Sequence, residues 1–335
     1  MTPPKLTFFC ELEADALKEL FADGTLIGDL KVLKASVSLG IIDFSQERAS
    51  VVSRLNQADI PVEAWLLLPK DQGYWFNLDN ASQTITRYAG FKTWSVKYGL
   101  QWSAIGLDIE PNIRILQALA ARKRRVLPSV LLRALKRGRL KRARAFYKEL
   151  DRQIHKDGYR VHSYQFPVIL DERKMGSTLL QRVSGLIDLP ADQEVHMLYT
   201  SFLRPYGSGV LWSYAPEAQA IGLGSTGGGV SIRLGDVRPL EFEELARDLR
   251  HAWCWTDDLY IFSLEGCVRQ GFISKLKKFE WDQPIIEPLE MAIRVDGWRN
   301  TFHSVLWISA HPWVILLCIL ALFLLFIPLR RRKTV

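Results

Sequence analysis

The sequence lacks the residue patterns that define several large classes of protein. Its four cysteines, Cys10, Cys254, Cys267 and Cys318, are widely spaced, and no CxxC or Cys/His metal-ligand spacing occurs. We therefore expect small buried thiols and predict no metal site and no cofactor. The chain also has no P-loop, no glycine fingerprint after its first strand and no GxSxG elbow. These absences argue against nucleotide-binding α/β folds and serine hydrolases.

A secretory leader is also missing, whereas the other end of the chain is strongly apolar. The first 20 residues lack an apolar core of signal-peptide type. Residues 313–329 form an uncharged apolar run, which reaches the ~20 residues needed to cross a bilayer when 310–312 are included. We predict a juxtamembrane linker over 291–309, a transmembrane helix over 310–329 and a basic tail over 330–335. The protein is thus expected to be an integral membrane protein anchored at its C-terminus.

The side of the membrane on which the large domain lies is a separate question. Without a leader, a C-terminal anchor leaves that domain in the cytosol. The positive-inside rule, applied to Arg330-Arg331-Arg332-Lys333, favours the opposite side. We favour the cytosolic side, because a basic segment within the domain suits the anionic cytoplasmic leaflet.

Positive charge is concentrated in that one segment. The chain carries a net charge of +8, and residues 111–148 contain 13 Lys and Arg and no acid. The rest of the chain holds the other 31 of the 44 basic residues and all 36 acidic ones, so it carries a small net negative charge. We predict a basic insertion at about 112–145, which is either a solvated helix or, through 122–144, a contact with anionic lipid. Binding of nucleic acid is a weaker alternative, because the basic segment contains no recognisable nucleic-acid-binding motif and no set of aromatic residues on which bases could stack.

Short apolar segments alternate with helical patterns along most of the chain. The expected strands are residues 5–13, 32–44, 61–69, 103–110, 159–168, 194–201, 220–223 and 259–264. The main expected helices are residues 14–21, 46–57 with Ser45 as N-cap, 81–98, 143–156, 178–183 and 240–252. Eight strands separated by helices predict an α/β (β/α)8 TIM barrel over residues 1–290.

Two carboxylates mark the end of the fourth expected strand. In Ser103–Pro111, alternation places Asp108 and Glu110 on the same face, at the strand end where barrel enzymes collect catalytic groups. Burying two acids side by side costs free energy, which favours a site over a structural role. Further candidates on or after strands and in loops are Glu11, Glu13, Trp75, Tyr164, Gln165, Tyr199 and Glu265. Acids among aromatic rings suit a sugar, whose CH faces stack on rings while its hydroxyls need hydrogen bonds.

Two short motifs carry a family resemblance. Asp108-Ile109-Glu110 resembles the end of the DxxDxDxE motif of the family 18 (chitinase-like) glycoside hydrolases, and Met197-Leu198-Tyr199 resembles that family's MxY. The resemblance implies that Glu110 is the general acid, that Asp108 orients a 2-acetamido group acting as internal nucleophile, and that Tyr199 steadies it. Ser103 and Gly106 stand where the family has its two earlier aspartates.

Other functions remain open at this stage. Glu110-Pro111 also resembles the NEP motif of two-carboxylate glycosidases, with Glu265 or Glu13 as the substitute nucleophile. A barrel that has lost catalysis and binds carbohydrate or a membrane partner is another alternative, as is a lyase. His162 and His196 are expected on barrel strands one residue out of phase with the site, in structural roles.

Overall fold

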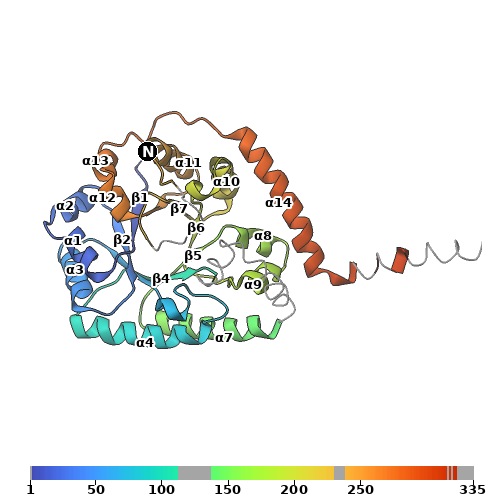
Figure 1. Ribbon diagram of the computed structural model, residues 1–335, viewed down its shortest axis with the longest axis horizontal. Helices are drawn as coiled ribbons and strands as arrows, with labels where there is room; N and C mark the ends of the chain where they lie inside the picture. The colour runs from blue at the N-terminus through green and yellow to red at the C-terminus, as the bar shows by residue number, and fades with distance from the viewer. Residues whose placement is uncertain (1, 112–136, 230–237, 315–316, 318–319, 323–335) are drawn as a thin grey trace, which may run out of the picture.

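The predicted (β/α)8 barrel is confirmed. The computed structural model describes residues 2–111, 137–229, 238–314, 317 and 320–322, and in it eight parallel strands close into a barrel in chain order (Figure 1). The strands are β1 (Lys5–Cys10), β2 (Ser36–Ile41), β3 (Val62–Leu66), β4 (Ala104–Ile109), β5 (Val161–Gln165), β6 (Gln193–Met197), β7 (Ala220–Gly224) and β8 (Asp258–Phe262). Pairing of β1 with β8 closes the ring.

Alternation along each strand divides the core in two. Phe8 of β1 belongs to the large cluster between the strands and the surrounding helices. Its neighbour Phe9 points the other way, into a second cluster inside the barrel with Trp65, Tyr164 and Tyr260. Consecutive side chains of a strand face opposite sides, so a strand buried on both faces is apolar throughout. The large aromatic rings make the barrel interior a packed core.

The helices surround this barrel. They are α1 (Ala14–Leu20), α2 (Thr25–Val32), α3 (Gln46–Gln57), α4 (Ala81–Tyr98), α7 (Arg137–Lys156), α8 (Val168–Lys174), α9 (Leu179–Ser184), α10 (Gly207–Tyr214), α11 (Phe242–Trp253), α12 (Leu264–Arg269), α13 (Phe272–Leu276) and α14 (Leu289–Ala310). The bounds of α3 and α4 are those predicted. Ser45 caps α3 as expected, accepting a hydrogen bond from the Arg48 amide at 3.2 Å.

The basic insertion is described only at its C-terminal end. Residues 137–145 are the first turns of α7, which therefore begins six residues before the predicted residue 143. This helix lies along α4 (Figure 1) and buries Leu140 and Tyr147 beneath it. The rest of the predicted insertion, residues 112–136, lies outside the described residues, as does most of the 122–144 segment predicted to contact lipid.

Residues 291–309, the predicted juxtamembrane linker, belong to a helix held against the barrel. This helix, α14, packs on α10 and α8 and extends beyond the barrel at its C-terminal end (Figure 1). Its buried Arg299 donates to Asp171 Oδ1 at 2.8 and 3.0 Å and to Glu217 at 2.7 Å. His303 lies 2.7 Å from the same Asp171 oxygen. These ionic contacts, which the apolar pattern alone did not reveal, fix α14 in place.

No helix within the described residues is both long and apolar enough to span a bilayer. Much of the predicted transmembrane segment 310–329 lies outside that part of the chain, at residues 315–316, 318–319 and 323–329. The basic tail over 330–335 lies outside it entirely.

Candidate functional site

Two acids stand at the carboxyl end of β4, inside the mouth of the barrel. Asp108 is only 2% exposed, whereas Ile109 faces the outer core, as alternation requires. Glu110 follows the last strand residue and is partly exposed. The backbone of Phe76 pairs with this end of β4: its amide donates to Asp108 O at 2.9 Å, and its carbonyl accepts from the Glu110 amide at 3.1 Å. The backbone that carries both acids is therefore held by hydrogen bonds to Phe76.

One oxygen of Asp108 is occupied and the other is available. Trp65 of β3 donates its indole N–H to Oδ2 at 3.2 Å, while Oδ1 is buried and has no hydrogen-bond partner among the described residues. Burial, followed by the charges of Glu110 and Glu11, raises the pKa of Asp108 well above its ordinary value. A buried carboxyl group with an unused oxygen is ready to receive a polar group of a ligand.

Glu110 has the protonation state of an acid catalyst. Burial and then the nearby Glu11 carboxylate raise the pKa of Glu110 from 4.5 to about 8. At neutral pH the side chain therefore carries its proton. A partly exposed carboxylic acid at the barrel mouth can donate that proton to a bound substrate.

Glu11 lies beside these acids and is held by a tyrosine. It follows β1 directly and is 7% exposed, and its Oε1 accepts the phenolic hydrogen of Tyr74 at 2.6 Å. Burial and the Glu11 charge raise the pKa of Tyr74, so the phenol keeps its proton and remains a donor. Tyr74 packs edge-on against Trp75, which is 5% exposed and belongs to the inner aromatic cluster.

Tyr199, which follows β6, lies near the same acids. It lies two residues beyond β6, partly exposed, with its ring stacked on Phe262 at a centroid distance of 5.6 Å. Burial raises the pKa of Tyr199, and the charges of Asp108, Glu110 and Glu11 raise it further. The phenol is thus within electrostatic reach of all three acids.

A glycine-rich segment lies over this group. Gly229 donates its amide hydrogen to Glu265 Oε1 at 3.1 Å, and Oε2 of Glu265 is buried without a partner among the described residues. Burial raises the pKa of Glu265. Gly229 has φ +75, and a Cβ there would lie 2.3 Å from the Phe262 ring and 2.4 Å from Glu11 Oε2. Only glycine allows the chain to pass this close to both acids.

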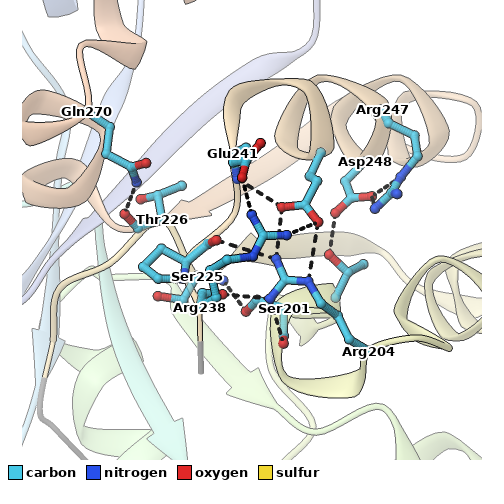
Figure 2. Close-up of polar contacts among 12 residues, drawn as sticks. Ser201, Arg204, Ser225, Thr226, Arg238, Glu241, Arg247, Asp248 and Gln270 are labelled. Carbon is cyan, nitrogen blue, oxygen red and sulfur yellow. Dashed lines mark hydrogen bonds and ion pairs between the residues drawn. The ribbon is translucent and has the colours of Figure 1, made fainter. Parts of the chain in front are cut away.

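The base of this segment is tied to its surroundings. The Ser225 amide donates to Ser201 Oγ at 2.7 Å, and Gln270 donates to the Thr226 carbonyl. Figure 2 shows these contacts beside Arg204, which donates to the Arg238 carbonyl at 2.6 Å. The structure places this segment at the mouth and anchors its first residues.

Three of the predicted site residues lie elsewhere. Glu13 is exposed and pairs with Lys70 at 3.3 Å. Gln165 points out of the barrel and donates to the Leu189 carbonyl at 2.9 Å. Tyr164 lies inside the barrel below the acids, and its hydroxyl would be 2.2 Å from a Cβ at residue 106. Gly106 therefore leaves room for Tyr164 where the resembled family has an aspartate.

Sequence reasoning missed a polar network beneath the site. Glu63 of β3 accepts from Tyr164 at 3.0 Å and Tyr260 at 2.9 Å and lies 3.3 Å from His162 Nδ1. His162 was predicted to be out of phase with the site. That prediction was wrong, because His162 lies two residues before Tyr164 and shares its inward face. An acid in the middle of an apolar strand, Val62–Leu66, is the signal that could have revealed the network.

Among the described residues, no group of three or more His, Cys, Asp or Glu side chains is arranged to hold a metal ion. The structure instead brings together Glu11, Asp108, Glu110, Tyr199 and Glu265, with Tyr74 and Trp65 as hydrogen-bond donors. Carboxyl groups whose pKa is raised by burial, next to oxygens of Asp108 and Glu265 without partners among the described residues, are suited to proton transfer and to binding polar groups.

Comparison with known proteins adds little to this geometry. No family model matches the chain, and no curated protein matches it. Among solved structures, it is similar to a D-allulose 3-epimerase from Methylomonas sp., with 9% identity and a TM-score of 0.43, covering 89% of this chain and 99% of that one. A likeness this low carries no argument about chemistry. The chain is an eight-stranded parallel (β/α)8 barrel by its own strand order.

Proposed function

We propose that this protein is a carbohydrate-acting enzyme that hydrolyses a glycosidic bond, with Glu110 as general acid. The observation that carries the proposal is the pair at the end of β4. Glu110 is partly exposed with its pKa raised to about 8, and Asp108 beside it is buried with Oδ1 unpartnered. The family 18 resemblance adds that the substrate is N-acetylated.

In the proposed reaction, Glu110 donates its proton to the glycosidic oxygen as the C–O bond breaks. The carbonyl oxygen of the substrate's 2-acetamido group attacks the anomeric carbon, and Asp108 accepts the acetamido N–H through Oδ1. Tyr199 donates a hydrogen bond to the same acetamido carbonyl. Water then attacks the anomeric carbon, the bond from that carbon to the acetamido oxygen breaks, and the water gives its proton to the Glu110 carboxylate, which restores the acid and the free acetamido group.

The positions of the other acids favour this route over two-carboxylate hydrolysis. That alternative needs Glu265 or Glu13 as nucleophile. Glu13 is exposed and paired with Lys70, and burial raises the pKa of Glu265, which disfavours the carboxylate form that a nucleophile needs. The alternative of a non-catalytic barrel that binds carbohydrate is favoured by one observation, the filling of the space at Gly106 by Tyr164.

Aryl N-acetylglucosaminides with different leaving groups test the proposal. We expect Glu110→Gln to lower kcat/KM ~10²–10⁴-fold for the poorer leaving group methylumbelliferone, because general acid catalysis of bond breaking is lost. The loss of kcat/KM should be much smaller for dinitrophenolate, which leaves without a proton. The exposed Glu19→Gln variant is the charge-matched control. Binding of N-acetylated glycan by wild type without any turnover would support the non-catalytic alternative and exclude hydrolysis.

We further propose that residues 310–329 anchor the barrel to a membrane, with the barrel on the cytosolic side. Supporting this, α14 carries exposed Trp298 and Trp307, and it ends at Ala310, three residues before the apolar run 313–329 in the sequence. Protease protection in intact cells tests the side. Protection of the barrel from external protease is expected, and digestion without permeabilisation would contradict the cytosolic placement.

A further inference from the structure

A cavity that shares no lining residue with the barrel-mouth site lies where α7, α9 and the end of α14 meet. Its volume is about 360 Å³, within the range of small-ligand sites. Lys141 and Arg144 of α7 and Arg182 of α9 line it, together with Ser309 near the end of α14. Its described lining holds these three cations and no acidic residue.

The cations of this cavity differ from others on the same helix. Elsewhere on α7, Arg139 is paired with Asp79, and Arg152 with Glu149. Lys141 and Arg144 have no acidic partner among the described residues. Arg144 is nevertheless held in position, because its guanidinium donates to Gln181 Oε1 at 3.1 Å. A guanidinium fixed in this way loses little side-chain entropy when it binds an oxyanion.

The other cavity walls also offer fixed polar groups. Arg182 is 8% exposed, and its Nε donates to the Thr178 carbonyl at 3.0 Å, which holds its side chain against α9. Ser309 Oγ lies 2.8 Å from Ser177 Oγ, so the end of α14 is joined to the segment before α9. The site is therefore assembled only when α14 is docked.

We propose that this cavity binds the phosphate group of an anionic lipid headgroup. Three cations and hydroxyl groups suit phosphate oxygens. The choice of a lipid source comes from position: Ser309 and Ala310 close the cavity, and the uncharged apolar run 313–329 follows within a few residues. A headgroup bound here would lie where the chain is proposed to enter the bilayer. The inference depends on that proposed anchor and is independent of the proposed hydrolase activity.

Titration calorimetry of the full chain in neutral detergent tests this site. The probes are dihexanoyl phosphatidic acid, dihexanoyl phosphatidylcholine and inorganic phosphate. We expect saturable binding of phosphatidic acid, at least tenfold tighter than that of phosphatidylcholine or phosphate. Lys141→Gln with Arg144→Gln should weaken it at least tenfold, and Lys141→Gln alone, at an exposed side chain, should weaken it measurably without affecting folding.

The matched control removes two exposed cations of α7 outside the cavity, as Arg142→Gln with Lys148→Gln. Unchanged binding in this control supports the site. An equal loss in the control would mean diffuse attraction to a basic surface and would overturn the proposal. Equal affinity for inorganic phosphate would overturn the lipid source, and absence of saturable binding to all three probes would overturn the site itself.

Discussion

The raised pKa of Glu110 predicts that this residue destabilises the protein at alkaline pH. In the unfolded chain the carboxyl group ionises at its ordinary pKa of 4.5, whereas in the native state it keeps its proton up to about pH 8. Between these values the native state binds more protons than the unfolded state, so the free energy of unfolding falls as pH rises. Glu110→Gln cannot ionise and therefore removes this loss.

The size of the effect follows from the same values. Each pH unit in that window is worth about 1.4 kcal/mol for one group, which sets an upper bound of roughly 4–5 kcal/mol. Glu110 is partly exposed and shares its field with other acids, so we expect a gain of about 1–3 kcal/mol for Glu110→Gln at pH 8.5. At pH 4.5 the gain should nearly vanish, because the native state then holds the proton and the unfolded state holds it half of the time.

Urea unfolding of wild type and Glu110→Gln at pH 4.5, 6.5 and 8.5 measures this difference. Exposed Glu19→Gln serves as the control and should show no gain that grows with pH. A variant that is equally stable to wild type at pH 8.5, or a gain over wild type that shrinks as pH rises, would refute the reasoning. Such a result would mean that Glu110 is solvated and ionised at neutral pH.

Three further predictions concern other parts of the site and its support. Glu11→Gln keeps a side-chain oxygen that can accept from Tyr74 but removes a charge that raises the pKa of Glu110. The pH at which kcat/KM falls on the alkaline side should therefore move about one unit lower. An unchanged pH would mean that the Glu11 charge does not act on Glu110. Gly229→Ala should lower the free energy of unfolding by about 1–3 kcal/mol more than Gly158→Ala does. Both glycines have positive φ, but only a Cβ at residue 229 would meet close neighbours. Equal losses would contradict the close approach of residue 229 to Phe262 and Glu11. Arg299→Met removes the guanidinium that pairs with buried Asp171, so we expect a loss of about 3–5 kcal/mol and faster proteolysis of α14. Unchanged proteolysis would mean that this ion pair does not hold the helix.

The barrel could be predicted because its signal is repeated along the chain. Eight apolar segments at the right spacing are buried on both faces, and each reports the same architecture independently. The bounds of α3 and α4 were predictable from local chemistry, namely the Ser45 cap and the glycine that follows Tyr98. Short α8, α10 and α12 escaped prediction, because tertiary contacts rather than a periodic apolar face hold them.

The site could be predicted only in part. Asp108 and Glu110 could be identified from the sequence, because two acids at the end of an apolar strand are costly to bury. The hydrogen bond from Tyr74 to Glu11 spans 63 residues, and nothing in either local sequence indicates it. Tyr164 was expected to bind substrate from its strand position, but its long side chain extends into the space left by Gly106. Depth along the barrel axis is a property of packing that alternation alone does not reveal.

The most direct test of the account is the pH dependence of kcat/KM for an aryl N-acetylglucosaminide, measured on wild type and Glu110→Gln. The account predicts activity that falls as pH rises through about 8 in the wild type, as Glu110 loses its proton. The variant should lose this limb together with most of its turnover. Wild-type turnover that persists unchanged in the variant, with the same alkaline limb, would contradict the assignment of Glu110 as proton donor.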